Sequence, residues 1–238
     1  MTETPPGSDA EASAETAIVI DVVSDVMCPW CYIGKRRLEA AIENTPYQLD
    51  IHWRPFQLDG TLPPDGKDRK AYLAEKFGSV EKAGQIYENV TAAGDLEGIP
   101  FAFDKIEVSP NTLDAHRLIR WAGGASQDLQ DRIVESLFQA YFLYGENIGD
   151  HAVLVRIAED AGMDGKLVAE MLAKDADRDL VSKEIELSQK MGVTGVPTFI
   201  VDNKYAIVGA QPAEQLVEAI HAIVSQRNAN DNPAPPQA

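Results

Sequence analysis

Cysteine and histidine are scarce in this chain of 238 residues, which has two cysteines, Cys28 and Cys31, and four histidines. A four-ligand zinc site needs a second pair of ligands beside a Cys-x-x-Cys pair. No two of the four histidines have the spacing of such a pair. The sequence therefore does not predict a metal site.

Long apolar runs are also missing, and none reaches the length that spans a bilayer. The first sixteen residues lack the basic and apolar regions of a secretory signal. We therefore expect a cytoplasmic protein with no membrane partner. A reducing compartment of that kind disfavours structural disulfides.

Basic residues are few. The chain has 21 Lys and Arg residues and 38 Asp and Glu residues, which gives a net charge of −17. A field of this sign repels nucleic-acid phosphates and anionic lipids. We therefore expect neither as a partner. The acidity itself is typical of a soluble surface.

The chain ends and its first elements are readily interpreted. Residues 1–16 and 227–238 have the composition of disordered tails. The apolar, β-branched run at residues 17–23 predicts a strand buried on both faces, and a helix follows it. Residues 49–56 alternate like a half-buried strand. Strand, helix and strand at this spacing predict a parallel βαβ unit.

The remaining pattern is mostly helical. From about Lys67 to Lys190 the sequence shows helical periodicity with few strand signals. Strand signals return at Thr198–Val201 and Tyr205–Val208, separated by turn residues, and predict a hairpin. A last helix follows Pro212 and buries Leu216, Ile220 and Ile223.

The cysteine pair admits four interpretations, of which a metal site is already disfavoured. A structural disulfide would close a tiny loop and gain little stability. Two buried core cysteines would not explain the intervening Pro29 and Trp30 at a strand–helix junction. A redox dithiol explains that position, because unpaired N–H groups and the helix dipole stabilise a thiolate at Cys28. We then expect a surface-accessible pair in which Cys28 attacks a disulfide and the shielded Cys31 resolves the product.

The neighbours of Cys28 suggest further roles. Pro29 stiffens the first helical turn, and Trp30 offers an apolar surface beside the sulfur. Asp25, three residues before Cys28, is either a proton acceptor that tunes the site or an ordinary capping or surface carboxylate.

A second segment, "GVTGVPTFIV", places Pro197 at the start of a strand. Proline cannot donate to a strand ladder, so it marks an edge or a special backbone conformation. If this segment lies against Cys28, the backbone of Val196 can pair with an extended substrate. An ordinary trans proline at a sheet edge fits the sequence as well.

These motifs resemble a known family. "CPWC" after an apolar strand, with "GVTGVPTFIV" before a hairpin and a terminal helix, resembles the thioredoxin-fold thiol oxidoreductases. The long helical insertion is similar to that of the DsbA group. "SDVMCPWCYIGKRRLEAAI", "SPNTLDAHRLIRWA" and "LFQAYFLYGENIGD" resemble its FrnE-like subfamily, and the resemblance covers about residues 18–225.

The resemblance implies an α/β fold. A thioredoxin-like domain would comprise residues 17–60 and 185–226, with an all-helical domain inserted at 61–184. It implies a cis-proline at Pro197 facing the dithiol, and a cytosolic thiol-disulfide oxidoreductase or isomerase that acts on protein or peptide disulfides. No cofactor is implied beyond the Cys28–Cys31 disulfide, with glutathione as a candidate reductant. Because Pro-Trp replaces the histidine-containing dipeptide of periplasmic DsbA enzymes, strong oxidising power is not implied.

Two alternatives stay open. The kappa-class glutathione transferases and 2-hydroxychromene-2-carboxylate isomerases share the insertion and an "NT…AHR" segment, but they carry serine at the first motif position. That likeness would place Asn111, His116 and Arg117 in the active-site cleft. Asn111 could equally start a helix, and His116 could be a core residue. The other alternative is a non-catalytic redox sensor. Neither oligomeric state nor the direction of electron flow follows from the sequence.

Overall fold

The computed structural model describes residues 17–231, so the expected tails at 1–16 and 232–238 lie outside the described residues. The strands are β1 (Ile18–Ser24), β2 (Leu49–Pro55), β3 (Lys67–Asp68), β4 (Val108–Ser109), β5 (Thr198–Val201) and β6 (Tyr205–Val208). The helices are α1 (Pro29–Glu43), α2 (Arg69–Phe77), α3 (Val80–Leu96), α4 (Leu113–Ala125), α5 (Gln127–Phe142), α6 (His151–Asp160), α7 (Gly165–Ala173), α8 (Arg178–Lys190) and α9 (Ala213–Asp231), with a short 3-10 turn, η1 (Phe103–Lys105).

The central sheet has the order β2-β1-β5-β6. β1 and β2 are parallel with Ile18 opposite Leu49, which confirms the predicted βαβ unit. β5 runs antiparallel to β1 and to β6, and the predicted hairpin has the expected boundaries. Its turn residues Asp202 and Asn203 both have positive φ, as tight hairpin turns require. β1 is therefore an inner strand, consistent with its apolar sequence.

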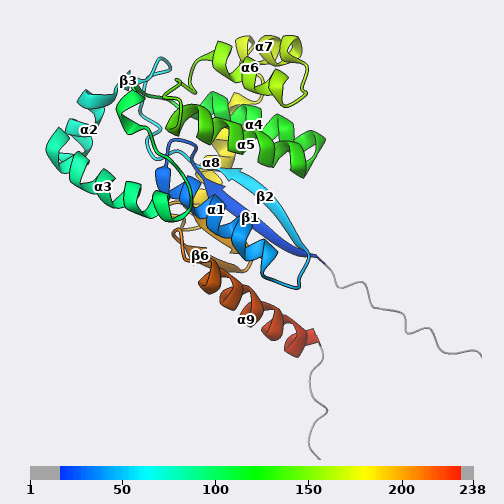
Figure 1. Cartoon of the computed structure of the whole chain (residues 1–238). Coiled ribbons are helices and arrows are strands. Elements are labelled where there is room, and N and C mark those ends of the chain that lie inside the picture. The colour runs from blue at the N-terminus through cyan, green and yellow to red at the C-terminus, as the bar shows by residue number, and fades with distance from the viewer. Residues whose placement is uncertain (1–16, 232–238) are drawn as a thin grey trace, which may run out of the picture.

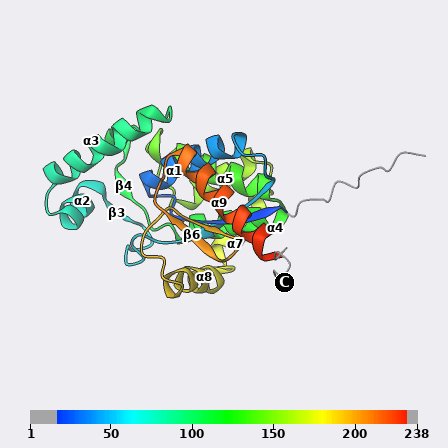
Figure 2. The same ribbon diagram turned by 90° about the horizontal axis from the view of Figure 1, so that it is seen from below.

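Helices cover both faces of this sheet. Figure 2 shows α1 and α9 on one side and α8 on the other. The predicted buried face of α9 is confirmed, since Leu216, Ile220 and Ile223 are at most 7% exposed. The sheet is thus a buried middle layer, as expected when helices pack on both faces.

The segment between β2 and α8 forms a helical cap, with α4 to α7 above the sheet and α2 and α3 beside it (Figure 1). One continuous core joins the cap to the sheet, because Val22 of β1 and Phe138 of α5 belong to the same apolar cluster. We expected an all-helical cap, but the cap also contains two short strands. β3 and β4 form a short antiparallel ladder, and two-residue strands are too short to show a period in sequence.

Two predicted boundaries differ from the structure. The boundary expected between residues 184 and 185 falls inside α8. The C-terminal tail was expected from residue 227, but residues 227–231 belong to α9. Helical periodicity does not by itself show where a helix ends, and the polar residues after 226 continue the last turns of α9.

A buried charge cluster joins α1 to α5. Lys35 is 3% exposed and pairs with Glu39, with Asp131 at 3.1 Å and with Glu135 at 3.3 Å. Burial lowers the pKa of Lys35, but these carboxylates outweigh it and raise the pKa above its ordinary value. Burial raises the pKa of Glu135, but Lys35 and Arg36 hold it below its usual range. The cluster therefore fixes the cap against the helix that carries the two cysteines.

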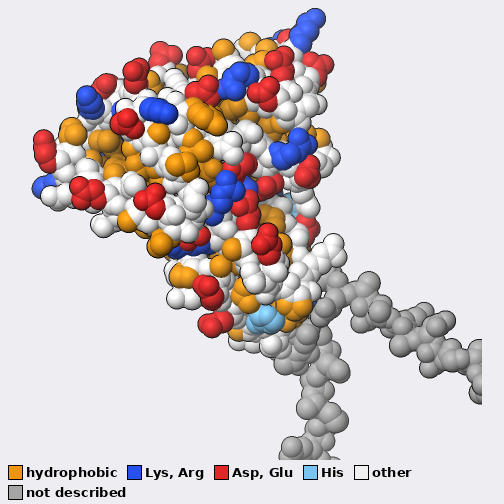
Figure 3. All heavy atoms as spheres, in the orientation of Figure 1, with side chains coloured by type: hydrophobic (Ala, Val, Ile, Leu, Met, Phe, Trp, Pro, Cys, Tyr) orange, Lys and Arg blue, Asp and Glu red, His pale blue; other side chains and the backbone are white. Residues whose placement is uncertain are grey.

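The surface carries charges of both signs. On the face shown in Figure 3, acidic and basic side chains are interspersed rather than segregated. Within residues 17–231, no helix combines the length and the apolar character that crossing a membrane requires.

Candidate active site

Cys28 occupies the N-cap position of α1. β1 ends at Ser24, and a short turn brings Cys28 to an extended conformation with φ −93° and ψ 114°. Pro29 is in the first turn, as predicted, and the first turn carries no acidic side chain. The Cys31 N–H donates to the Cys28 carbonyl at 3.0 Å, so Cys31 lies about one helical turn after Cys28. Helix N–H groups at this position favour a negative sulfur atom.

Both thiols are free; Cys31 is shielded as we expected, whereas Cys28 is far less exposed than we expected. Cys28 is 4% exposed and Cys31 is 1% exposed, whereas Trp30 between them is 38% exposed. The prediction of a surface-accessible pair is therefore wrong as stated. Cys28 is covered because the Val196 carbonyl lies 3.7 Å from its sulfur, while Trp30 projects to solvent.

The Val196–Pro197 peptide bond is cis, which confirms the isomer that the family resemblance implied and excludes a trans edge proline. Cys28 Sγ faces this segment and can donate to the Val196 carbonyl. Pro197 is anchored by the hydrogen bond from Gly209 N–H to its carbonyl at 2.8 Å. On its other side it packs closely on α1, where a Cβ added to Gly34 would lie 2.8 Å from Pro197 Cγ. The loop and the dithiol are thus held together by α1.

Cys31 lies in an environment that disfavours its thiolate. Burial raises the pKa of Cys31 well above its ordinary value, and the hydrogen bond and charge of Cys28 raise it further. The Ser24 hydroxyl and the backbone at Asp25 oppose this only in part. Cys31 therefore keeps its proton at neutral pH and must lose it before it can attack a disulfide.

Asp25 is fully buried and is not a surface carboxylate. Its Oδ2 accepts a hydrogen bond from the Leu58 N–H at 2.7 Å, and its Oδ1 accepts one from Met27 at 3.4 Å. His116 Nε2 also lies 3.4 Å from Asp25 Oδ1. The carboxylate therefore holds the turn before Cys28 and faces a histidine of the cap.

Asn111 lies at the start of α4 and contacts a loop rather than the thiols. Its Oδ1 accepts from the Leu113 N–H and from Gln57 Nε2, each at 3.0 Å. Its Nδ2 donates to the Leu62 carbonyl at 2.6 Å. These contacts hold the loop at residues 57–62, the same loop that caps Asp25 through Leu58.

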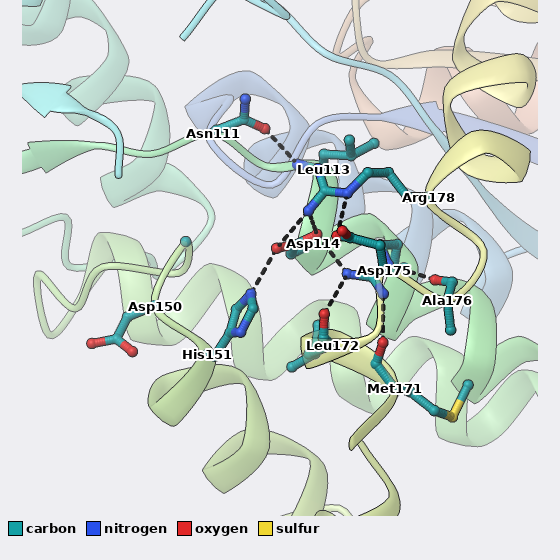
Figure 4. Close-up of polar contacts among 12 residues, drawn as sticks. Asn111, Leu113, Asp114, Asp150, His151, Met171, Leu172, Asp175, Ala176 and Arg178 are labelled. Atoms are coloured by element: carbon teal, nitrogen blue, oxygen red, sulfur yellow. Dashed lines mark hydrogen bonds and ion pairs between the residues drawn. The ribbon is translucent and has the colours of Figure 1, made fainter. Parts of the chain in front are cut away.

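Arg117 does not line a cleft, so its placement from the family likeness is wrong. Its side chain is fully buried and donates to the carbonyls of Met171, Leu172 and Ala176. It also pairs with Asp114 at 2.8 Å. Figure 4 shows this cluster, in which Asp114 further contacts His151 and Arg178. Arg117 points away from the site because it satisfies the carbonyls at the end of α7.

Sequence reasoning missed Arg69, a buried cation of α2. Arg69 is 5% exposed and donates to the hydroxyls of Tyr87 at 2.8 Å and Tyr141 at 2.9 Å. In the described part of the chain it forms no ion pair with a carboxylate. Burial raises the pKa of Tyr87, the positive charge of Arg69 opposes this, and the charge of Cys28 adds to it. No sequence signal marked Arg69, because arginine in a helix is usually exposed.

The chain that carries this dithiol is similar to known proteins. The sequence profile of the DSBA-like thioredoxin domain matches residues 19–221. A probable DsbA oxidoreductase of Streptomyces coelicolor is 29% identical, with 93% of each chain covered and a TM-score of 0.79.

Two more distant structures share the fold. A 2-hydroxychromene-2-carboxylate isomerase is 17% identical, covers 90% of this chain and 99% of its own, and has a TM-score of 0.67. The cytosolic disulfide reductase DsbM of Pseudomonas aeruginosa, solved with GSH, is 18% identical, covers 88% and 98%, and has a TM-score of 0.59. The narrower FrnE-like assignment stays a prediction. The family profile, which spans most of the chain, shows that this protein belongs to the DSBA-like thioredoxin domain family.

Proposed function

We propose that this protein is a thiol-disulfide oxidoreductase that acts on protein or peptide disulfides through Cys28 and Cys31. The observation that carries the proposal is the position of Cys28, at the N-cap of α1 with the Val196 carbonyl 3.7 Å from its sulfur. Membership of a family of DsbA-like oxidoreductases supports it.

The proposed reaction has two exchanges. The Cys28 thiolate attacks one sulfur of the substrate disulfide, whose S–S bond breaks and releases the first substrate thiolate. Cys31 then attacks Cys28 Sγ, so the mixed disulfide breaks and the second substrate thiolate leaves. The substrate gains two electrons and the dithiol becomes a disulfide. Both substrate thiolates take up protons, one of which replaces the proton that Cys31 loses.

Substrate contacts follow from two groups beside the sulfur. The backbone of Val196 can pair with an extended peptide, as an added strand does. The half-exposed ring of Trp30 offers that peptide an apolar surface next to the motif. Both groups favour an extended peptide over a compact small molecule.

We further propose glutathione as the reductant, in a reducing cytosolic compartment. The fold similarity to a cytosolic disulfide reductase solved with GSH supports this choice. Two glutathione molecules would return the two electrons, become oxidised glutathione and regenerate the dithiol. The scarcity of cysteines also suits a compartment in which structural disulfides are rare.

A second candidate is a glutathione-dependent isomerase acting on a small aromatic molecule. Its support is the shared fold of the 2-hydroxychromene-2-carboxylate isomerase. The presence of both thiols at the start of α1 favours the dithiol chemistry instead. Isomerase turnover that persists after both cysteines are replaced by serine would favour this second candidate.

The test is reduction of insulin disulfides in the presence of glutathione. We expect wild-type turnover and its loss in Cys28→Ser, because the nucleophile is gone. His221→Gln is a matched control, since this half-buried histidine of α9 contacts Tyr47 rather than the dithiol. Equal rates for wild type and Cys28→Ser would overturn the proposal. A wild type without turnover, whose oxidation only changes affinity for a partner, would point to a redox sensor.

A further inference from the structure

A large pocket lies at the junction between the central sheet and the helical cap. Its volume is about 680 Å³, within the range of roughly 300–1,000 Å³ that small-molecule sites occupy. Residues of β2, α4, α7 and α8 line it, and such junctions between domains often hold small-molecule sites. Neither cysteine lines it, and neither do Trp30, Val196 or Pro197. The pocket is therefore a candidate site distinct from the substrate face at Cys28.

One wall of the pocket is the indole ring of Trp121, which is held in a fixed position. Its Nε1 donates a hydrogen bond to Asp177 Oδ2 at 2.9 Å. The guanidinium carbon of Arg117 lies 5.1 Å from the centre of a Trp121 ring, as a cation–π contact requires. Arg117 is fully buried and does not line the pocket, so it supports the ring from the protein side. A half-buried ring fixed in this way can pack on a planar ligand without losing conformational freedom of its own.

The rest of the wall is largely apolar, and part of it is adaptable. Leu167 is 54% exposed, so the pocket opens to solvent beside α7. Trp53 is buried and fixed, because its Nε1 donates to Asp131 at 3.1 Å. Methionine side chains are flexible and polarizable, and they adjust to ligands of different outline. Further apolar side chains in the wall are Ile119, Met163, Val168 and Met171.

The cations of the wall already have carboxylate partners. Arg120 pairs with Glu184, which lines the pocket with it. Arg54 pairs with Asp21, and His52 also faces a carboxylate, at 3.3 Å. An anionic ligand would therefore meet no cation of the wall that lacks such a partner.

Two further carboxylates, Asp164 and Asp177, also line the pocket. Asp164 accepts a hydrogen bond from the Leu167 N–H at 3.0 Å, and Asp177 accepts the one from Trp121. An anionic ligand would face these carboxylates, whereas a cationic ligand would face two guanidinium groups. Because burying a charge without a partner is costly, the wall favours an uncharged ligand.

His116 provides a buried polar group in this wall. It is 3% exposed and lines the pocket. Asp25 Oδ1 lies 3.4 Å from His116 Nε2, yet this nitrogen has no hydrogen-bond partner among the described residues. Buried polar atoms are almost always satisfied. The imidazole is therefore left for a polar group of a ligand.

We propose that this pocket binds a small, uncharged, planar aromatic molecule that carries a hydrogen-bonding group. The aromatic ring packs on Trp121 and on the apolar side chains of α7, and the polar group meets His116. The site is separate from the dithiol, so the inference goes beyond the proposed function and does not depend on it.

Two fluorescent probes with the same ring scaffold test the proposal. N-phenyl-1-naphthylamine is uncharged and carries one amine N–H, whereas 8-anilino-1-naphthalenesulfonate has an added sulfonate. We expect the uncharged probe to bind saturably, with a single molecule per chain. Fluorescence titration should show that it binds at least about tenfold more tightly than the sulfonate probe.

Matched leucine variants locate the probe. Leu167→Glu adds a carboxylate to the wall and should weaken binding of the uncharged probe about tenfold. Leu187→Glu is the control, because Leu187 is also an exposed leucine of a helix, at 56%, and does not line the pocket. Both variants should keep the melting temperature of the wild type, since both side chains are exposed. Trp121→Leu removes the aromatic wall and should also weaken binding.

Trp30→Ala shows whether the probe binds at the dithiol face instead, and we expect it to leave the affinity unchanged. Equal affinities of wild type and Leu167→Glu, or loss of binding in Trp30→Ala, would overturn the site. Absence of saturable binding of the uncharged probe would overturn it as well. Equal or tighter binding of the sulfonate probe would overturn the ligand class. None of these results affects the insulin-reduction test of the proposed function, so the two failures are distinguishable.

Discussion

Gly34 of α1 provides a sharp test of how the cis-proline loop is held. A Cβ at this position would lie 2.8 Å from Pro197 Cγ and 3.5 Å from Phe199 Cζ. Carbon atoms in contact normally lie about 3.5–4.0 Å apart. Because the proline ring is tied to its backbone, Gly34→Ala must move the loop or the helix.

The magnitude follows from two opposing effects. Alanine favours a helix over glycine by about 1 kcal/mol, whereas overpacking costs about 1–3 kcal/mol. We expect Gly34→Ala to lower the free energy of unfolding by roughly 1 kcal/mol. The matched control is Gly84→Ala in α3, where a Cβ meets nothing within 4 Å, so the same change should add about 1 kcal/mol.

Chemical denaturation of the two variants measures this difference directly. For a chain of this length, a separation of about 2 kcal/mol corresponds to melting temperatures about 4–8 °C apart. Gly34→Ala should also slow insulin reduction, because a displaced Pro197 moves the Val196 carbonyl away from Cys28. If Gly34→Ala stabilises the protein as much as Gly84→Ala does, the close contact between α1 and the loop is refuted.

Three further substitutions test separate features. Lys35→Met should cost about 1–2 kcal/mol of unfolding free energy, because Glu39 and Glu135 keep Arg36 as a partner while Asp131 and the half-buried Glu135 lose the Lys35 ammonium. Since the pKa of Glu135 is depressed in the folded state, wild-type stability should fall as pH drops below about 4.5, and urea titrations at several pH values should show a smaller fall in Lys35→Met. Arg117→Met should lower stability by about 3 kcal/mol, since three buried carbonyls lose their donor and Asp114 keeps only His151 and Arg178 as partners; an unchanged melting temperature would contradict this. Trp30→Ala should raise KM for peptide disulfides several-fold while leaving the melting temperature nearly unchanged, and equal KM values would remove Trp30 from the substrate surface.

Local patterns in the sequence predicted the parts of the fold that depend on local physics. The apolar run before Cys28, the proline after it and the turn at Asp202 each carry their signal within a few residues. Those signals suffice to place Cys28 at a helix start and to place the hairpin of β5 and β6. The cis bond at Pro197 required the family resemblance, since the residues alone fitted either isomer.

The remaining features depend on contacts between distant segments. Cys28 is covered by Val196, 168 residues later, so its burial has no local signal. Arg117 is buried because it meets carbonyls that lie 54 to 59 residues along the chain. Arg69 is buried by tyrosines of α3 and α5. In each case the burial is set by contacts with distant segments, which the local sequence does not encode.

The most direct test of the central claim is which cysteine forms the mixed disulfide. Cys31→Ser should form a stable adduct with oxidised glutathione, detected by intact-mass spectrometry and mapped to Cys28, because nothing resolves it. Cys28→Ser should form little or none, since the remaining thiol is 1% exposed and its raised pKa keeps it protonated. Adduct formation at equal rates in the two variants would contradict the assignment of Cys28 as the nucleophile.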